Sequence, residues 1–375
     1  MLKLMKVNEE FRMMCTVKLG ITMNRLYFVL QITVLMMLSG PLAAQQLPAA
    51  ESWERDEAWR ASTSVSTQSE RNRLSQLLKA GNTTATLNLI RQIVQRSDWP
   101  GPARERVIFE FTSSLRQETP RAADDELIAY LMDFQSTVFI PHEDHPASGV
   151  PMFNIKGAAA GVVNGWSRQE AAFQGATLIS YDPVSLAPAY LAENSRPRQQ
   201  GLLDALDTAS PAQLQALSGF ALAGLDSEPE LIAIAAKAAL MNADIDALLV
   251  LAEKGRGVQM QGLFKESADL FGLQKNQLML QAALRNPSSE TAALAIAQLA
   301  PTLAGHKPTQ DLLLKLLGDP QLGSSSALAL AMNPGTRVLG ELQRLADSEQ
   351  NVLSASRARL ALQIHASQFS TQTLR

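Results

Sequence analysis

Hydrophobic residues recur at helical spacing along most of the chain after residue 69, and the pattern is clearest between Asp319 and Ala346. There the sequence predicts two short amphipathic helices joined by a tight turn at Asn333-Pro334-Gly335. The positions on one face are Ala327, Leu328, Leu330 and Ala331 in the first helix, and Val338, Leu339, Leu342, Leu345 and Ala346 in the second. Neither helix can bury this face alone, so the pair requires a similar pair stacked against it.

The same pattern predicts two helical regions, residues 70–198 and 199–366, followed by a disordered tail at 367–375. The first region begins with four helices arranged as two hairpins. Their apolar faces are Leu74, Leu77 and Leu78; Leu87, Ile90, Ile93 and Val94; Val107, Ile108, Phe111 and Leu115; and Leu127, Ile128, Leu131 and Met132. Further helix starts are predicted at Asp182-Pro183, at Ser210-Pro211 and at a capping box in Ser227–Glu230.

A repeat is visible in the second region. The breaks that precede its helices are separated by 29, 29 and 33 residues and lie near Pro229, Val258, Pro287 and Pro320. A unit of about 30 residues with two helices has the size of an α-solenoid repeat. Asp319–Ala346, and less regularly Asp226–Ala252, resemble HEAT-like (armadillo-type) repeats, and the resemblance extends over about Ser210–Ala366. It implies a protein-binding or scaffolding role. The expected fold class is all-α, an α-solenoid of stacked helical hairpins, with other helical hairpins as the alternative.

Composition supports a helical fold and narrows the partners. Aromatic residues make up only 5% of the chain, and runs typical of strands are scarce. The formal net charge is −3 without a basic block or stripe, so we expect no nucleic-acid partner. The single cysteine, Cys15, lies in the predicted leader, and a chain without the leader therefore has no disulfide and no thiol nucleophile.

Residues 1–44 predict a leader with a signal peptide at 23–44. Arg25 precedes the apolar run Leu26–Leu38, and small residues follow up to the expected cleavage site after Ala44. Removal of the leader takes away five Lys or Arg and two Asp or Glu, which changes the net charge from −3 to −6. We therefore expect a periplasmic protein with no integral membrane segment after cleavage. An uncleaved anchor in the inner membrane is the alternative, although the run is shorter than the ~20 residues of a comfortable span.

Two segments interrupt the helical pattern. Residues 45–69 are polar and predict a flexible linker, with a short docked helix around Trp53 and Trp59 as the alternative. Residues 134–166 predict one long irregular loop, and long loops often carry function. Within it, the small residues of Gly157–Gly161 are expected to let helices approach closely.

The sharpest candidate for chemistry in this loop is His142-Glu143-Asp144-His145. Imidazole and carboxylate groups are ligands for zinc, iron or manganese, so His142, Asp144 and His145 define a possible metal-dependent hydrolase. Pro141 and Pro146 bracket the segment and favour a turn, and the spacing differs from the helical HExxH motif. A polar loop held by hydrogen bonds to its own backbone is therefore the preferred interpretation.

The preferred function is non-enzymatic: a scaffold that binds another envelope protein or peptide and uses no cofactor. Aromatic anchors with a polar rim are typical of binding hot spots. The predicted binding residues are Phe139, His142, Glu143, Asp144, His145, Phe153 and Trp166. Trp166 has an alternative role as a core residue. A small-ligand binder remains a third possibility if the helices enclose a deep pocket.

Overall fold

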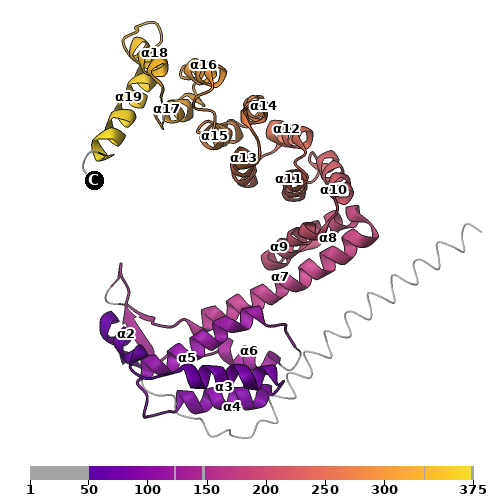
Figure 1. The fold of residues 1–375 in the computed structure, drawn as a ribbon, viewed down its shortest axis with the longest axis vertical. Coiled ribbons are helices and arrows are strands. Elements are labelled where there is room, and N and C mark those ends of the chain that lie inside the picture. Colours follow the sequence, from indigo (N-terminus) through magenta and orange to yellow (C-terminus); the bar gives the residue numbers. More distant parts are fainter. Residues whose placement is uncertain (1–49, 122–123, 146–147, 333, 373–375) are drawn as a thin grey trace, which may run out of the picture. The chain divides into compact units, whose positions relative to one another are not determined.

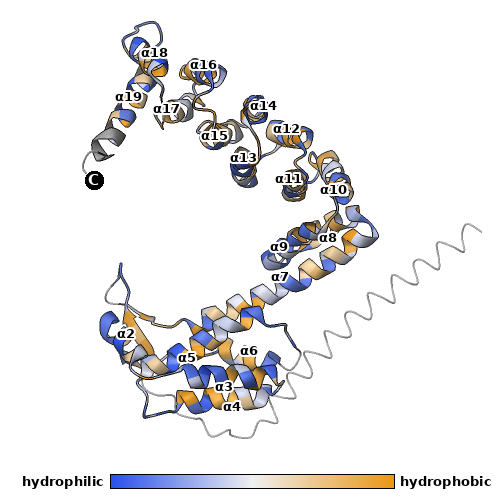
Figure 2. Cartoon of the chain, in the orientation of Figure 1, coloured by the Kyte–Doolittle hydropathy of each residue, from blue (hydrophilic) through white to orange (hydrophobic). Residues whose placement is uncertain are grey.

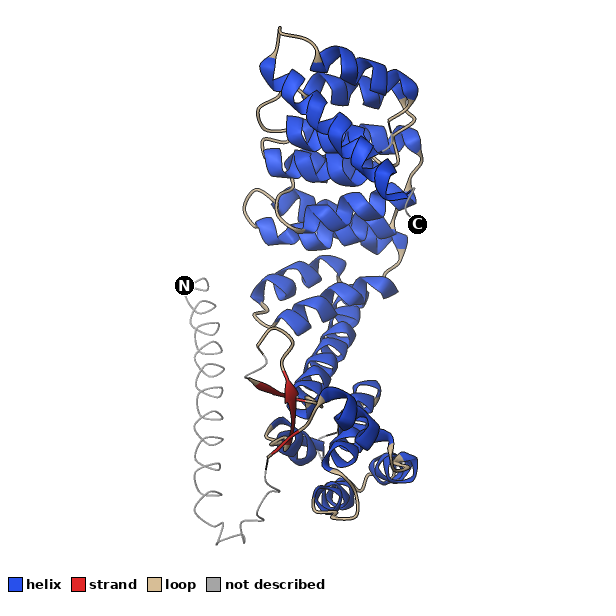
Figure 3. Cartoon of the chain, turned by 90° about the vertical axis from the view of Figure 1, so that its left-hand side faces the viewer, coloured by secondary structure: helices blue, strands red, loops and turns tan. Residues whose placement is uncertain are grey.

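The computed structural model describes residues 50–372 except 122–123, 146–147 and 333. It is 73% helical, with 18 α-helices in the described residues, which confirms the all-α class (Figure 3). These residues form two compact units: unit 1 contains 50–108 and 135–154, and unit 2 contains 109–134 and 155–372. The predicted leader and residues 373–375 of the predicted tail lie outside the described residues. Residues 367–372 belong to the helix Val352–Gln372, so the prediction of a disordered tail is wrong for this part.

Unit 1 combines helices with a small sheet. Its elements are β1 (Glu51–Ser52), α2 (Arg55–Thr63), α3 (Gln68–Lys79), α4 (Thr83–Val94), the first part of α5 (Gly101–Ser114), β2 (Val138–Pro141) and β3 (Gly149–Pro151). Strand β2 lies in the centre, parallel to β1 and antiparallel to β3. The sheet is drawn in red in Figure 3. Helices α3 and α4 confirm the first predicted hairpin.

The prediction of a flexible linker at 45–69 is wrong for its described part. The backbone N–H groups of Glu51 and Trp53 donate to the carbonyls of Thr137 and Phe139, at 2.6 and 2.9 Å. Helix α2 follows at once and buries Ala58 completely. The alternative of a short helix after Trp53 therefore describes this segment, because strand pairing fixes its start and burial holds its apolar face.

The prediction of one irregular loop at 134–166 is also wrong. Its first half contains β2 and β3, which pair in the register Phe139–Pro151, Ile140–Val150 and Pro141–Gly149. Its last part is the start of α7 (Ile155–Tyr181), the longest described helix. Helical structure extends back to Ile155 because Ile155, Ala159 and Val162 are spaced on one face and are fully or almost fully buried.

Unit 2 is built from helices alone in its described residues. After the end of α5 the α-helices are α6 (Asp125–Met132), α7, α8 (Leu186–Ala192), α9 (Arg196–Asp204), α10 (Pro211–Gly224), α11 (Ile232–Met241), α12 (Ile245–Lys254), α13 (Gln259–Leu270), α14 (Leu273–Leu284), α15 (Ser289–Leu299), α16 (Lys307–Leu316), α17 (Gly323–Met332), α18 (Thr336–Ala346) and α19 (Val352–Gln372). Described 3₁₀ turns lie at Leu115–Gln117, Pro183–Ser185, Ala205–Thr208 and Pro229–Leu231. The repeat breaks predicted from sequence precede α11, α13, α15 and α17.

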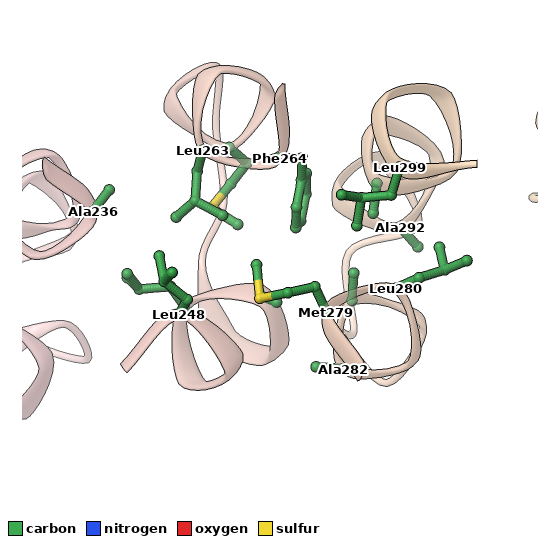
Figure 4. Packing of buried hydrophobic residues seen from close by; sticks show 14 of the residues in the cluster. Ala236, Leu248, Leu263, Phe264, Met279, Leu280, Ala282, Ala292 and Leu299 are labelled. Carbon is green, nitrogen blue, oxygen red and sulfur yellow. The ribbon is translucent and has the colours of Figure 1, made fainter. Parts of the chain in front are cut away.

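Helices from α9 onward lie in two rows. Each odd-numbered helix from α9 to α19 contacts the next odd-numbered one, and the even-numbered helices α10, α12 and α14 form the facing row with α16 and α18 (Figure 1). The space between the rows is filled by aliphatic side chains. In Figure 4, Leu263 and Phe264 of α13 point into this space, where Leu248 of α12 and Met279 of α14 face them.

One hydrophobic cluster extends through unit 2 from Ala171 to Ala361. It crosses the position between residues 198 and 199 at which the sequence suggested a boundary, and the structure divides the chain elsewhere. The reason is that α7 packs along α9, so helices on both sides of that position share one core.

Close helix approach occurs at glycines that the sequence did not single out. A Cβ on Gly161 would meet open space, so this residue does not serve the close approach predicted for Gly157–Gly161. Instead, a Cβ on Gly175 of α7 would lie 2.6 Å from Cβ of Ala205. A Cβ on Gly201 of α9 would overlap the carbonyl oxygen of Arg168 on α7. These two glycines therefore set the spacing between α7 and its neighbours.

Side chains form hydrogen bonds with free backbone groups at several helix ends. Ser210 and Gln213 form a capping box at α10, as the Ser210-Pro211 start signal suggests. The capping box predicted at Ser227–Glu230 is absent, because Glu228 is the N-terminal flanking residue of a 3₁₀ turn and makes no side-chain cap. At the end of α12, Asn286 donates to the carbonyls of Ala252 and Gly255, at 3.0 and 2.8 Å.

No helix in the described ranges is long and apolar enough to cross a membrane. Figure 2 illustrates this for α7, in which hydrophilic and hydrophobic residues are mixed along the whole length.

Candidate functional site

The predicted His142–His145 segment is the connection of the β2–β3 hairpin in unit 1. The His142 N–H donates to the Ser148 carbonyl at 3.0 Å, and the Ser148 N–H donates to the His145 carbonyl at 2.8 Å. The two imidazole rings are stacked with centroids 5.6 Å apart. The hairpin is therefore held by its own backbone, as the polar-loop interpretation expects.

The side chains of this hairpin are engaged with one another and with α2. The Asp144 N–H donates to Nδ1 of His142 at 3.1 Å. Glu143 pairs with Arg55 of α2, whose guanidinium hydrogen bond and charge lower the pKa of the Glu143 carboxyl. Both partners are largely exposed, so the pair contributes little to stability. Among the described residues, no three His, Cys, Asp or Glu side chains gather closely enough to hold a metal ion.

The three predicted aromatic anchors, Phe139, Phe153 and Trp166, lie in different parts of the structure. Phe139 is half-buried on β2, whereas Phe153 is only 8% exposed and is not available to a partner. Trp166 belongs to unit 2, where its indole N–H donates to the carbonyls of Leu115 and Glu118, at 3.1 and 2.9 Å. Trp166 is half-buried, and its indole N–H connects α7 to the backbone that directly follows α5.

A different surface in unit 2 has the features of a binding site. It is a hollow of about 410 Å³ across α9, α11 and α13, three consecutive helices of the odd-numbered row. Its lining residues are Gln200, Leu203, Ala233, Ala236, Lys237, Leu240, Met241, Gln259, Gly262, Leu263 and Glu266. An adjoining hollow of about 400 Å³ shares Leu240, Met241 and Glu266 and adds Asp269 and Leu270. We call these residues together the α9–α13 groove.

The floor of the α9–α13 groove is apolar, and its apolar rim is exposed. Leu203, Ala233 and Leu240 are partly buried, whereas Met241 and Leu270 are 41% and 48% exposed. Exposed apolar side chains that line a hollow together mark a binding surface more strongly than isolated ones do. Methionine suits such a surface because its flexible side chain adapts to different partners.

The charged side chains on the two sides of the α9–α13 groove differ in whether they form ion pairs. Lys237 Nζ lies 2.8 Å from Asp207 and 3.9 Å from Asp204, and Asp204 also accepts two hydrogen bonds from Arg168. Burial by itself raises the pKa of the Asp204 carboxyl, but these cationic partners and Gln200 lower it overall. The positive charges of Arg168 and Lys237 are thus balanced by the carboxylates of Asp204 and Asp207.

On the opposite side of the groove, Glu266 and Asp269 of α13 are exposed, and in the described part of the chain neither forms an ion pair. The groove therefore carries an uncompensated acidic edge.

Gly262 leaves part of the groove open. It is the fourth residue of α13, and no atom outside its chain neighbours and the nearby backbone of its own helix lies within 4 Å of the position that its Cβ would occupy. The sequence pattern did not identify the groove. The available signal was the repeat spacing, which predicts consecutive helices of one row but not which of their side chains remain uncovered.

No model of a known protein family, no curated protein and no solved structure matches the chain. The functional conclusion therefore depends on the geometry of the groove.

Proposed function

We propose that this protein is a non-enzymatic scaffold of the α-solenoid type, built from HEAT-like helical repeats, that binds another envelope protein or peptide. The observation that carries the proposal is the α9–α13 groove, which runs across three consecutive helices of one row. In stacked helical repeats one helix of each unit lines an extended concave surface on which partners bind. The odd-numbered row is the candidate for that surface.

The pattern of contacts between helices supports a solenoid. Contacts in unit 2 run between neighbouring helices of a row and between the two rows, as expected when each repeat packs on the adjacent one. The starts of α11, α13, α15 and α17 follow the repeat spacing of the sequence. A groove in such an array can bind a partner without any catalytic group, since apolar contact area and a polar rim suffice for recognition.

The place of action follows from the leader. We propose that residues 23–44 direct export and are cleaved after Ala44, so that a chain with a net charge of −6 acts in the periplasm. The alternative is that the apolar run stays in the inner membrane as an anchor. Mass spectrometry of the protein recovered from the envelope distinguishes them, because cleavage predicts an N-terminus at or near Gln45.

The first prediction tests the scaffold by affinity capture from the protein's own envelope extract. The chain beginning at Gln45 should retain one dominant protein partner, and Gly262→Leu should lose most of it, because the leucine fills the open part of the groove. Gly219→Leu is the matched control, since Gly219 lies in the middle of α10 in the other row and also faces open space.

Capture by Gly219→Leu should equal that of the unchanged chain. Failure to retain any partner would contradict the scaffold function. Equal capture by Gly262→Leu would show that the partner binds outside the groove.

A further inference from the structure

The shape and charge of the α9–α13 groove restrict its partner further. We infer that the groove binds an amphipathic helix whose polar face is basic. This inference rests on the proposed scaffold function and adds the chemical class of the partner.

The partner's backbone conformation follows from the elements that line the groove. All of them are α-helices, whose interior backbone N–H and C=O groups are already hydrogen-bonded within each helix. The groove thus offers no strand edge to which an extended peptide could add. A peptide that enters an apolar groove must then satisfy its own backbone hydrogen bonds, and a helix does so internally.

The partner's apolar face follows from the floor and the apolar rim. Leu203, Leu240 and Leu263 line the floor, and Met241 and Leu270 extend it outward. Aliphatic side chains at spacings of three and four residues on a docked helix match such a surface. Burial of apolar area then provides the main favourable free energy, about 25 cal/mol per Å² removed from water.

The partner's polar face follows from the uncompensated acidic edge. Glu266 and Asp269 are three residues apart on α13 and therefore lie on the same side of that helix. Lys237 and Arg168 do not offset them, because Asp204 and Asp207 already balance these two cations. Lys or Arg on the partner would face this edge, whereas Asp or Glu there would be repelled.

Three synthetic peptides of about 18 residues provide the test, since a helix of that length spans roughly 27 Å. The first places leucine at i, i+3, i+4 and i+7 and lysine elsewhere; the second replaces lysine with glutamate; the third scrambles the first. Fluorescence anisotropy with the chain beginning at Gln45 measures their dissociation constants. We expect the first to bind at least tenfold more tightly than the other two. The scrambled peptide is essential, because an acidic chain attracts any basic peptide to some extent.

Two variants locate the binding. Gly262→Leu should raise the dissociation constant of the leucine–lysine peptide at least tenfold, whereas Gly219→Leu should leave it unchanged. Glu266→Lys with Asp269→Lys should reverse the preference toward the leucine–glutamate peptide. Circular dichroism confirms that each variant is folded, which is expected because all four positions are exposed.

The inference would be overturned if the leucine–glutamate peptide or the scrambled peptide bound as tightly as the leucine–lysine peptide. It would also be overturned if Gly262→Leu bound the leucine–lysine peptide as tightly as the unchanged chain does. If these results occur while Gly262→Leu still loses the captured envelope partner, the scaffold function holds and only the partner chemistry is wrong. If no envelope partner is captured at all, the scaffold function itself fails.

Discussion

Gly201→Leu should destabilise unit 2 by about 3 kcal/mol or more, the upper range for inserting extra atoms into a packed interface. Gly201 lies in α9, where even a Cβ would overlap the Arg168 carbonyl oxygen and would come within 2.8 Å of the Ala171 Cβ. Both contacts belong to α7, and one is backbone that no rotamer change can move. The two helices must therefore separate, which exposes part of the shared core. Urea denaturation followed by circular dichroism measures the change.

Gly262→Leu is the matched control for this experiment. It makes the same substitution within a helix, but the new side chain meets open space. We expect no loss of stability and a gain of up to about 1 kcal/mol, because glycine is a poor helix former. If both variants unfold at the same urea concentration as the unchanged chain, the close packing of α7 and α9 described above is wrong.

Glu105→Ala should destabilise unit 1 by about 3 kcal/mol. The side chain is 3% exposed, and its Oε1 accepts hydrogen bonds from Thr137 N–H at 2.5 Å, Thr137 Oγ1 at 3.1 Å and Val138 N–H at 3.2 Å. These bonds fix the start of β2 against α5. Alanine leaves the buried Val138 N–H and the two half-buried donors of Thr137 without this acceptor, and a buried unpaired group costs about 1–3 kcal/mol.

Tryptophan fluorescence during urea denaturation measures this change, because Trp53, Trp59 and Trp99 all belong to unit 1. Glu105→Gln should lose less than half as much stability, since its amide oxygen still accepts from the same donors. His142→Ala with His145→Ala is the control in the same unit and should change stability by less than about 0.5 kcal/mol. A loss for Glu105→Ala as small as that of the control would contradict the role assigned to Glu105.

Glu105 also predicts a pH dependence. Burial raises the pKa of its carboxyl above the ordinary 4.5, although the hydrogen bonds from Thr137 and Val138 and the charge of Arg104 act in the opposite direction. With a raised pKa in the folded state, the contribution of the group to stability is complete below pH 4.5 and declines as pH rises toward the folded pKa. The stability of the unchanged chain relative to Glu105→Gln should therefore fall over that interval. A difference that stays constant or rises with pH would contradict a raised pKa.

The sequence was sufficient to predict most helices because their apolar faces follow a strict spacing. In α18, Val338, Leu342 and Ala346 are buried as the pattern indicates. In α17 the same reasoning assigned Leu328 to the buried face, yet this residue is 50% exposed. Periodicity defines the direction of a face but not its width, which depends on how closely the neighbouring helices approach.

The parts that sequence reasoning missed depend on contacts between distant segments. The parallel pairing of β1 with β2 joins residues 51–52 to residues 138–139, and two-residue strands carry no alternating pattern. The close approach at Gly201 depends on the position of Arg168 in another helix. The α9–α13 groove likewise forms from three helices separated along the chain, and its exposed Met241 and Leu270 resemble ordinary core residues in the sequence.

Site-specific photo-crosslinking tests the central claim most directly. A photoreactive amino acid at Met241, in the groove, is compared in cells with one at Val250 of α12, in the other row; the two positions have similar exposed fractions, 41% and 38%. We expect the Met241 probe to give one dominant cross-linked protein, the cross-linked segment to be a basic amphipathic helix, and the Val250 probe to give none. Cross-linking of a dominant partner from Val250, with none from Met241, would contradict binding along the odd-numbered row.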